Sequence, residues 1–292
     1  LMQRNSQCTV PFVVSDKGYG MLWHNPAVGE ATFGTNMTVW HAQSTHLIDY
    51  WITADDTPAA IVERYVQATG LPPMMPENAM GFWQSKLRYR TQEELLGVAR
   101  EYKRRGLPLD VIVIDFYHWT KFGDWKFDRE AWPDPEGMMK ELKEMGVEAA
   151  VSVWPSVQMS SENFGEMLAN GYLTQVDTGV RMSMRSASWT IFFDATNPDA
   201  RRYVWEKCKK SYYDAGIRYF WLDAAEPQYP SYLNYGSEPY RYQLGPHQVV
   251  GNLYPQVFVK GMYDGMREAG EEEILALVRC AWAGSQRYGA LV

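Results

Sequence analysis

The run LDVIVIDF, residues 109–116, constrains the fold of this chain more than any other stretch. Its continuous β-branched centre is typical of a strand that is buried on both faces of a parallel sheet. Further short apolar runs, separated by helical patterns, are found at 79–85, 147–154, 217–224 and 273–280. Strands that alternate with helices predict right-handed crossovers and a parallel sheet.

Sequence signals mark the ends of the helices between these strands. At 91–106, Thr91 and Glu94 have the spacing of a capping box, and the apolar residues share one helix face: Leu95, Val98, Ala99 and Tyr102. Gly106 ends that helix. Further helices are expected at 134–146, at 197–216 and near 255–269. The first two of these begin with Asp or Asn followed by Pro, which is typical of a helix start.

The fold class that fits is α/β, a (β/α)8 TIM barrel. An open doubly wound sheet usually carries a glycine-rich phosphate turn, and neither GxGxxG nor GxxxxGK occurs. Only about five of the eight barrel units are recognisable, so we expect an incomplete barrel. Residues 1–70 contain short strand-like runs broken by Gly, Pro and Asn. We therefore predict an antiparallel β region at 1–70 and a partial barrel at 71–292.

Composition excludes several classes of partner. The net charge of −7 is unsuited to nucleic acid, and no apolar run is long enough to span a membrane. The 3 widely spaced cysteines indicate neither a disulfide framework nor a zinc site, which weakly favours a cytoplasmic location. Both chain ends read as internal, so missing targeting signals carry no information and the compartment stays unknown. A homo-oligomer is possible.

The candidate active-site residues follow the ends of the predicted strands. In (β/α) barrels the active site forms at the carboxyl ends of the strands. The residues expected there are Trp83, Asp115, Trp154, Asp223 and Arg279, with Trp282 just beyond. Carboxylates, an arginine and flat aromatic rings suit a neutral, hydroxyl-rich ligand such as a sugar.

Other catalytic classes have weaker signals. The 5 histidines include no HExxH motif, and GxSxG is absent, so we predict no metal site, no cofactor and no serine nucleophile. Glycoside hydrolysis instead needs two carboxyl groups, about 5–5.5 Å apart for retention and about 6.5–9.5 Å apart for inversion.

Asp223 and Glu226 stand three positions apart in FWLDAAEP. Extended chain of that length covers roughly 10 Å, which suits retention poorly, although inversion or a turn between them remains open. Asp223 is the strongest single candidate because it stands at the strand tip.

Long, ordered motifs identify a resemblance that covers roughly residues 57–292. The stretches are IVIDFYHWTKFGDWKFDREAWPDPEGMMKELKEMGVEAAVSVWP, FFDATNPDARRYVWEK, FWLDAAEP and LVRCAWAGSQRYGALV. They resemble glycoside hydrolase family 31, the retaining family of α-glucosidases, α-xylosidases and related transglycosylases. PFVVSDKGYG resembles the end of that family's N-terminal β-sandwich domain.

The resemblance implies a role for each matching residue. Asp223 matches the catalytic nucleophile, Asp115 the carboxylate that binds sugar hydroxyls in subsite −1, and Arg279 the arginine that binds the same sugar. Glu226 matches an acidic position that supports the nucleophile and is not the acid. Pocket-lining positions are matched by Trp154, Trp221 and Trp282, although one branch of the family has Lys in place of Trp221.

The family's acid/base is an Asp in a W-x-G-D motif after the segment that matches RCAWAGSQRYG, and no residue of this chain matches it. We therefore expect the 292-residue fragment to be inactive and poorly soluble. The motifs DFYHW and WLDAAEP look most like the α-xylosidase branch, in which Phe116, Tyr117 or Trp119 would fill the space of the glucose hydroxymethyl group. The alternatives are an α-glucosidase, an α-glucosyltransferase or a non-catalytic carbohydrate-binding relative.

Overall fold

The structure is a computed structural model that describes residues 8–176, 184–185, 189–226 and 240–292. Pro227, the last residue of the FWLDAAEP motif, lies outside these residues. Within the described part of the chain, no helix combines the length and the apolar character that crossing a membrane requires.

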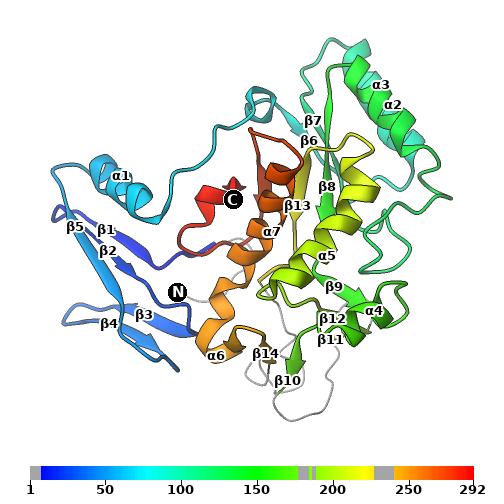
Figure 1. Ribbon diagram of the computed structural model, residues 1–292. Helices are drawn as coiled ribbons and strands as arrows, with labels where there is room; N and C mark the ends of the chain where they lie inside the picture. The colour runs from blue at the N-terminus through cyan, green and yellow to red at the C-terminus, as the bar shows by residue number, and fades with distance from the viewer. Residues whose placement is uncertain (1–7, 177–183, 186–188, 227–239) are drawn as a thin grey trace.

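The N-terminal region is antiparallel, as its short strand-like runs predict. Strands β1, β2 and β5 form one sheet in that order, and β3 pairs with β4 in a hairpin. Helix α1 follows, capped by the Thr57 side chain, which accepts from the Ala60 N–H. Figure 1 shows this region in blue beside the rest of the molecule. The bounds are β1 Phe12–Ser15, β2 Tyr19–Trp23, β3 Gly29–Phe33, β4 Thr38–Ala42, β5 Tyr50–Ala54 and α1 Pro58–Thr69.

The rest of the chain is built on a parallel sheet in the order β17-β16-β13-β8-β7-β6. All the strands predicted from the apolar runs are in it. Strand β17 is an addition that the sequence did not predict, because two residues are too short to show a periodic pattern. The bounds are β6 Trp83–Gln84, β7 Val111–Ile114, β8 Glu148–Val153, β13 Tyr219–Leu222, β16 Ala276–Val278 and β17 Ala290–Leu291.

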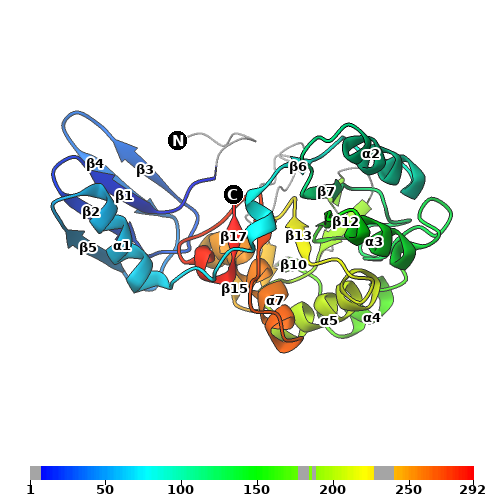
Figure 2. The ribbon, with the colours of Figure 1, turned by 90° about the horizontal axis from the view of Figure 1, so that it is seen from above.

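Helices cover the outer side of this sheet, and Figure 2 shows them following one another around it. Their bounds are α2 Gln92–Arg104, α3 Pro135–Glu144, α5 Pro198–Cys208, the π-helical turn η2 Lys209–Tyr213 and α7 Tyr254–Glu268. Thr91 caps α2 by accepting from the Glu94 N–H, as predicted. The Glu94 carboxylate, however, accepts from the Arg90 N–H, one residue before the position that a capping box predicts.

Short additional elements interrupt the barrel pattern after β8 and after β13, and the sequence did not predict them. Strands β11, β12 and β9 form one small antiparallel sheet, and β10, β14 and β15 form another. The bounds are β9 Ser156–Gln158, α4 Phe164–Ala169, β10 Gln175–Val176, β11 Met184–Arg185, β12 Trp189–Phe192, β14 Tyr240–Tyr242, β15 Gly245–Pro246 and α6 His247–Val250.

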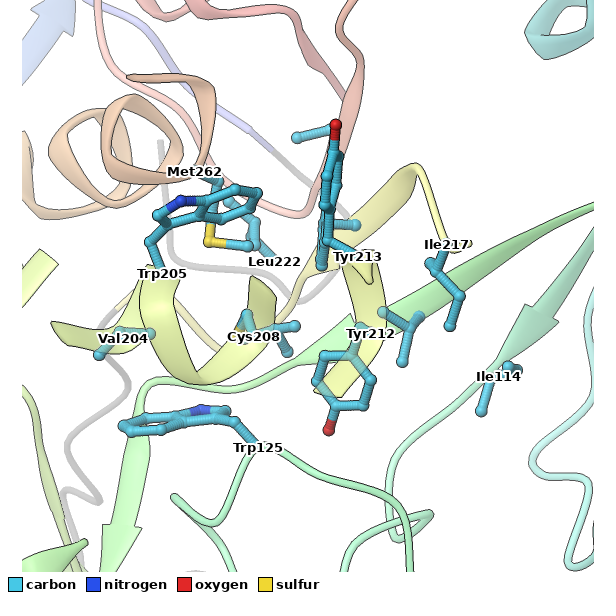
Figure 3. Packing of buried hydrophobic residues seen from close by; sticks show 14 of the residues in the cluster. Ile114, Trp125, Val204, Trp205, Cys208, Tyr212, Tyr213, Ile217, Leu222 and Met262 are labelled. Carbon is cyan, nitrogen blue, oxygen red and sulfur yellow. The ribbon is translucent and has the colours of Figure 1, made fainter. Parts of the chain in front are cut away.

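Strand β7 is buried on both faces, as its uninterrupted apolar run predicts. Successive residues of a strand point to opposite faces of the sheet, so the two sets of alternate residues pack in two separate clusters. Val111 and Val113 pack in one cluster with Ala150 of β8, Tyr219 of β13 and Leu275, which lies just before β16. The residues between them join the larger cluster with the helices, part of which is shown in Figure 3. This alternation decides which strand-end side chains face the inside of the curled sheet.

Candidate active site

Residues directly after four neighbouring strands meet at one edge of the parallel sheet. Asp115 follows β7, Trp154 follows β8, Asp223 follows β13 and Arg279 follows β16. The register brings Trp154, Asp223 and Arg279 level, because Ser152 lies opposite Trp221, and Trp221 lies opposite Leu277. Each of these three residues stands two positions beyond one of the paired residues and so points to the same face. Asp115 points to that face as well, two residues lower along the strands, because Val113 lies opposite Ala150.

Asp223 and Asp115 are the most buried candidate carboxylates at this edge, each with 6% of its surface exposed. The backbone N–H of Asp223 donates to the carbonyl oxygen of Val153, which ties the tip of β13 to β8. Burial raises the pKa of Asp223, while the positive charge of Arg279 lowers it. No hydrogen bond reaches Asp223 Oδ1 from any residue that the structure describes. A buried oxygen without a donor is costly in free energy and is available to a ligand.

Arg279 is shared between two carboxylates. It donates to both oxygens of Glu226, with Nη2 2.9 Å from Oε2. Its Nε also lies 3.5 Å from Asp223 Oδ1, which is an ion pair and not a hydrogen bond. The negative charge of Glu226 adds to the rise in the pKa of Asp223. Both oxygens of Glu226 are therefore occupied by Arg279.

Asp115 faces the same region from β7. Its Oδ1 accepts from the N–H of Phe116 at 2.7 Å. Burial raises the pKa of Asp115, and the charge of Asp223 raises it further, so the two carboxylates are close enough to interact. The charge of Arg88 has the opposite effect. Two interacting carboxylates in a buried setting are typical of a catalytic site.

An aromatic wall adjoins these carboxylates. The rings of Phe116 and Trp154 stack 5.6 Å apart with an angle of 12° between their planes. Trp119 and Phe122 pack against Trp154, with ring centroids 6.4 and 5.5 Å from that of Trp154. The indole N–H of Trp119 has no hydrogen-bond acceptor among the described residues. The indole N–H of Trp154 lies close enough to the Asp223 carboxylate to lower its pKa. The wall thus offers flat rings and a free donor, both of which suit a pyranose ring with its hydroxyl groups.

The other tryptophans occupy different places. Trp221 packs against the interior cluster, two residues before Asp223 in the chain. Trp282 packs with Leu22 and Tyr65, where the N-terminal region meets the barrel. Trp83 was expected at the carboxyl edge, and this was wrong, because it lies inside β6 opposite Val111, the first residue of β7. Its indole donates to the carbonyl oxygen of Ala79.

Two residues without the freedom of glycine adopt left-handed backbone conformations beside the carboxylates. Tyr117 has φ 60° and Ala224 has φ 54°. Such conformations cost energy, and they are found most often where a functional geometry requires them. The Ala224 N–H also lowers the pKa of Asp223, because it hydrogen-bonds to that carboxylate. The strand-end turns are therefore shaped around Asp115 and Asp223.

Sequence reasoning missed His118, which is buried three residues after Asp115. The only signal was its place in the DFYHW motif, since a single histidine gives no indication of its partners. Among the described residues, no group of three or more His, Cys, Asp and Glu side chains is arranged to hold a metal ion.

The family model "Glycosyl hydrolases family 31 TIM-barrel domain" matches residues 72–291. This confirms both the family to which the motifs pointed and the (β/α) barrel architecture.

Known proteins agree with this match. A family 31 glucosidase of Pseudescherichia vulneris, of uncharacterised activity, is 54% identical over 291 residues, which are 100% of this chain and 54% of that protein. An α-xylosidase of Saccharolobus solfataricus is 34% identical over 100% of this chain and 38% of its own length.

A solved structure is similar over almost the whole chain. The α-xylosidase from a soil metagenome, solved in complex with xylose, has a TM-score of 0.95 at 58% identity, over 99% of this chain and 42% of that protein. The chain thus spans about half the length of these relatives or less. It belongs to glycosyl hydrolase family 31.

Proposed function

We propose that this chain carries part of the active site of a retaining, exo-acting α-glycoside hydrolase that removes α-linked xylose from oligosaccharides. The observation that carries the proposal is the position of Asp223. It is a buried carboxylate at a barrel strand end, with an oxygen that no described residue binds and with Arg279 3.5 Å away. A nucleophile needs a lone pair that no hydrogen bond occupies and a nearby positive charge to stay ionised.

In the proposed reaction, Asp223 Oδ1 attacks the anomeric carbon of the sugar. The bond to the leaving-group oxygen breaks, and that oxygen takes a proton from an acid. Water then cleaves the glycosyl ester and restores the carboxylate of Asp223. Asp115 binds sugar hydroxyls, and the positive charge of Arg279 stabilises the negative charge of the Asp223 carboxylate. No residue of this chain is assigned the acid/base role.

Specificity for xylose is proposed from the aromatic wall. Phe116 directly follows the sugar-binding Asp115 and is fixed by its stacking on Trp154. In the proposed complex, this ring occupies the space of the hydroxymethyl group that distinguishes glucose from xylose. Two of the similar proteins, one a sequence relative and one a solved structure, are named α-xylosidases. The alternative of an α-glucosidase is favoured by the relative from Pseudescherichia vulneris, which is named a glucosidase.

The test is to compare kcat/KM for p-nitrophenyl α-xyloside and α-glucoside, using the complete gene product that contains this chain. NMR would identify the anomer of the first sugar released. The proposal predicts faster cleavage of the xyloside and α-xylose as the first product. Release of β-xylose would exclude retention. Sugar binding without turnover of either substrate would favour the non-catalytic alternative.

Residues 1–292 alone are proposed to be inactive and poorly soluble. Strands β6 and β17 are the edges of the parallel sheet that the structure describes. Exposed edge strands offer unpaired backbone groups and promote aggregation. Turnover of either substrate by the soluble 292-residue chain would overturn this part of the proposal.

A further inference from the structure

His118 has both of its ring nitrogens in hydrogen bonds although only 1% of its surface is exposed. Its Nδ1 lies 3.0 Å from the backbone carbonyl oxygen of Asp115. Its Nε2 lies 2.8 Å from the hydroxyl oxygen of Tyr212, a residue 94 positions away in the chain. The ring therefore connects the turn after β7 with the segment between α5 and β13.

The protons in this chain of hydrogen bonds follow from the chemistry of the partners. A carbonyl oxygen only accepts, so Nδ1 of His118 carries the proton. Burial lowers the pKa of His118 to about 4, so the ring is neutral near pH 7. Nε2 must then accept, and the Tyr212 hydroxyl must donate. Burial raises the pKa of Tyr212 well above its ordinary value, so this phenol keeps its proton.

The carbonyl group that His118 binds belongs to the same peptide unit as the N–H of Phe116. That N–H donates to Asp115 Oδ1 at 2.7 Å. Because a peptide unit is planar and rigid, fixing the direction of its C=O also fixes the direction of its N–H. The orientation of the Asp115 carboxylate is thereby linked to His118 through one rigid plane.

Tyr212 is itself held firmly. It lies in the π-helical turn η2, and none of its surface is exposed. Its backbone carbonyl accepts from the N–H of Ile217, just before β13. Figure 3 shows the side chains of Tyr212 and Tyr213 leaving η2 in different directions. A π-helical turn holds one residue more than an α-helical turn, and this geometry helps to set the direction of the Tyr212 hydroxyl.

We propose that His118 is a positioning residue that sets the orientation of the Asp115 carboxylate, with Tyr212 as the anchor of its ring. The inference rests on the proposed function, in which Asp115 binds sugar hydroxyls. His118 does not itself touch the sugar. Its effect is on affinity for the sugar ring, transmitted through the peptide plane between Asp115 and Phe116.

A double-mutant cycle tests the proposal in the complete gene product. Xylose affinity would be measured by tryptophan fluorescence for the wild type, His118→Gln, Asp115→Ala and the double variant. In His118→Gln, no N–H donor remains at the position of Nδ1. Xylose binding is expected to weaken about tenfold, which corresponds to the loss of one well-placed hydrogen bond. In the Asp115→Ala background the same change should have no further effect.

Two further variants separate positioning from general loosening. In His118→Asn the amide nitrogen replaces Nδ1, and binding should stay within about threefold of the wild type. His247→Gln is a matched control, because His247 is also buried, has a pKa lowered to about 4 by burial, and bonds to a tyrosine hydroxyl, that of Tyr242. It should lower thermal stability and leave xylose affinity unchanged.

The outcomes are distinct. An equal loss of affinity from His118→Gln with and without Asp115 overturns the positioning role and leaves the proposed function standing. An effect of His247→Gln as large as that of His118→Gln also overturns it. If Asp115→Ala alone leaves xylose affinity unchanged, both the proposed role of Asp115 and the inference built on it fail.

Discussion

Arg279 donates to both carboxylate oxygens of Glu226, although 53 positions separate the two residues in the chain. This pairing distinguishes the surroundings of the two carboxylates in FWLDAAEP. Glu226 is engaged on the arginine, whereas Asp223 keeps Oδ1 without a hydrogen bond from the described residues. The same guanidinium interacts with both carboxylates, so replacing Glu226 or Arg279 should change the pKa of Asp223.

Replacing the proposed nucleophile should abolish hydrolysis. In the complete gene product, Asp223→Ala is expected to lower kcat by roughly 10⁴-fold or more, the scale seen when a hydrolase loses its nucleophile. With an activated aryl α-xyloside and added azide, azide should attack the anomeric carbon in its place. The product expected by NMR is the β-glycosyl azide. Near-normal hydrolysis by this variant would contradict the assignment.

Removing the charge of Glu226 should shift the acid limb of the pH profile. Burial, together with the charge of Glu226, raises the pKa of Asp223, and the reaction needs Asp223 ionised. Glu226→Gln should therefore lower that pKa and move the acid limb of kcat/KM to lower pH.

The opposite shift is expected for Arg279→Met, because the positive charge of Arg279 lowers the pKa of Asp223. Both profiles would be measured from about pH 3 to 8 against the wild type. Shifts of the same sign in the two variants would show that Asp223 does not govern the acid limb.

Opening the aromatic wall should relax specificity. Phe116→Ala removes the ring stacked on Trp154 and makes space beside Asp115. The ratio of kcat/KM for α-glucoside to that for α-xyloside is expected to rise roughly tenfold or more. Phe122→Ala is the matched control, since the buried ring of Phe122 also packs against Trp154. A similar rise with the control would mean that loosening alone explains the change.

Buried histidines should make the folded state sensitive to acid. Burial lowers the pKa of His247 from 6.5 to about 4, so between these values the unfolded chain binds a proton that the folded chain does not. Stability from this residue is therefore lost as the pH falls from about 6.5 to 4, by up to about 3 kcal/mol. Asp194, whose pKa is raised by burial, acts with the opposite sign.

The measurement is the free energy of unfolding in urea as a function of pH. The difference between the wild type and His247→Gln isolates the histidine. The variant should lose less stability between about pH 6.5 and 4 than the wild type does. Parallel curves would show that His247 is not buried in its neutral form.

The principal strands and helices were predictable because their signals are local. The β-branched run of β7, the caps of α2 and α3 and the glycine after α2 all act through neighbours in the chain. Asp115 and Asp223 could be placed at one edge because parallel strands present their carboxyl ends together. Trp83 was misplaced because β6 is only two residues long and its register cannot be read from its sequence.

The sequence by itself determined the family, the parallel sheet and the strand-end candidates, since these depend on residue order over short spans. Only the tertiary structure decided that Glu226 binds Arg279 and that Tyr212 reaches His118. Those contacts join residues 53 and 94 positions apart. Pairing at such separation depends on how whole strands and helices pack, and no local preference of a side chain encodes it.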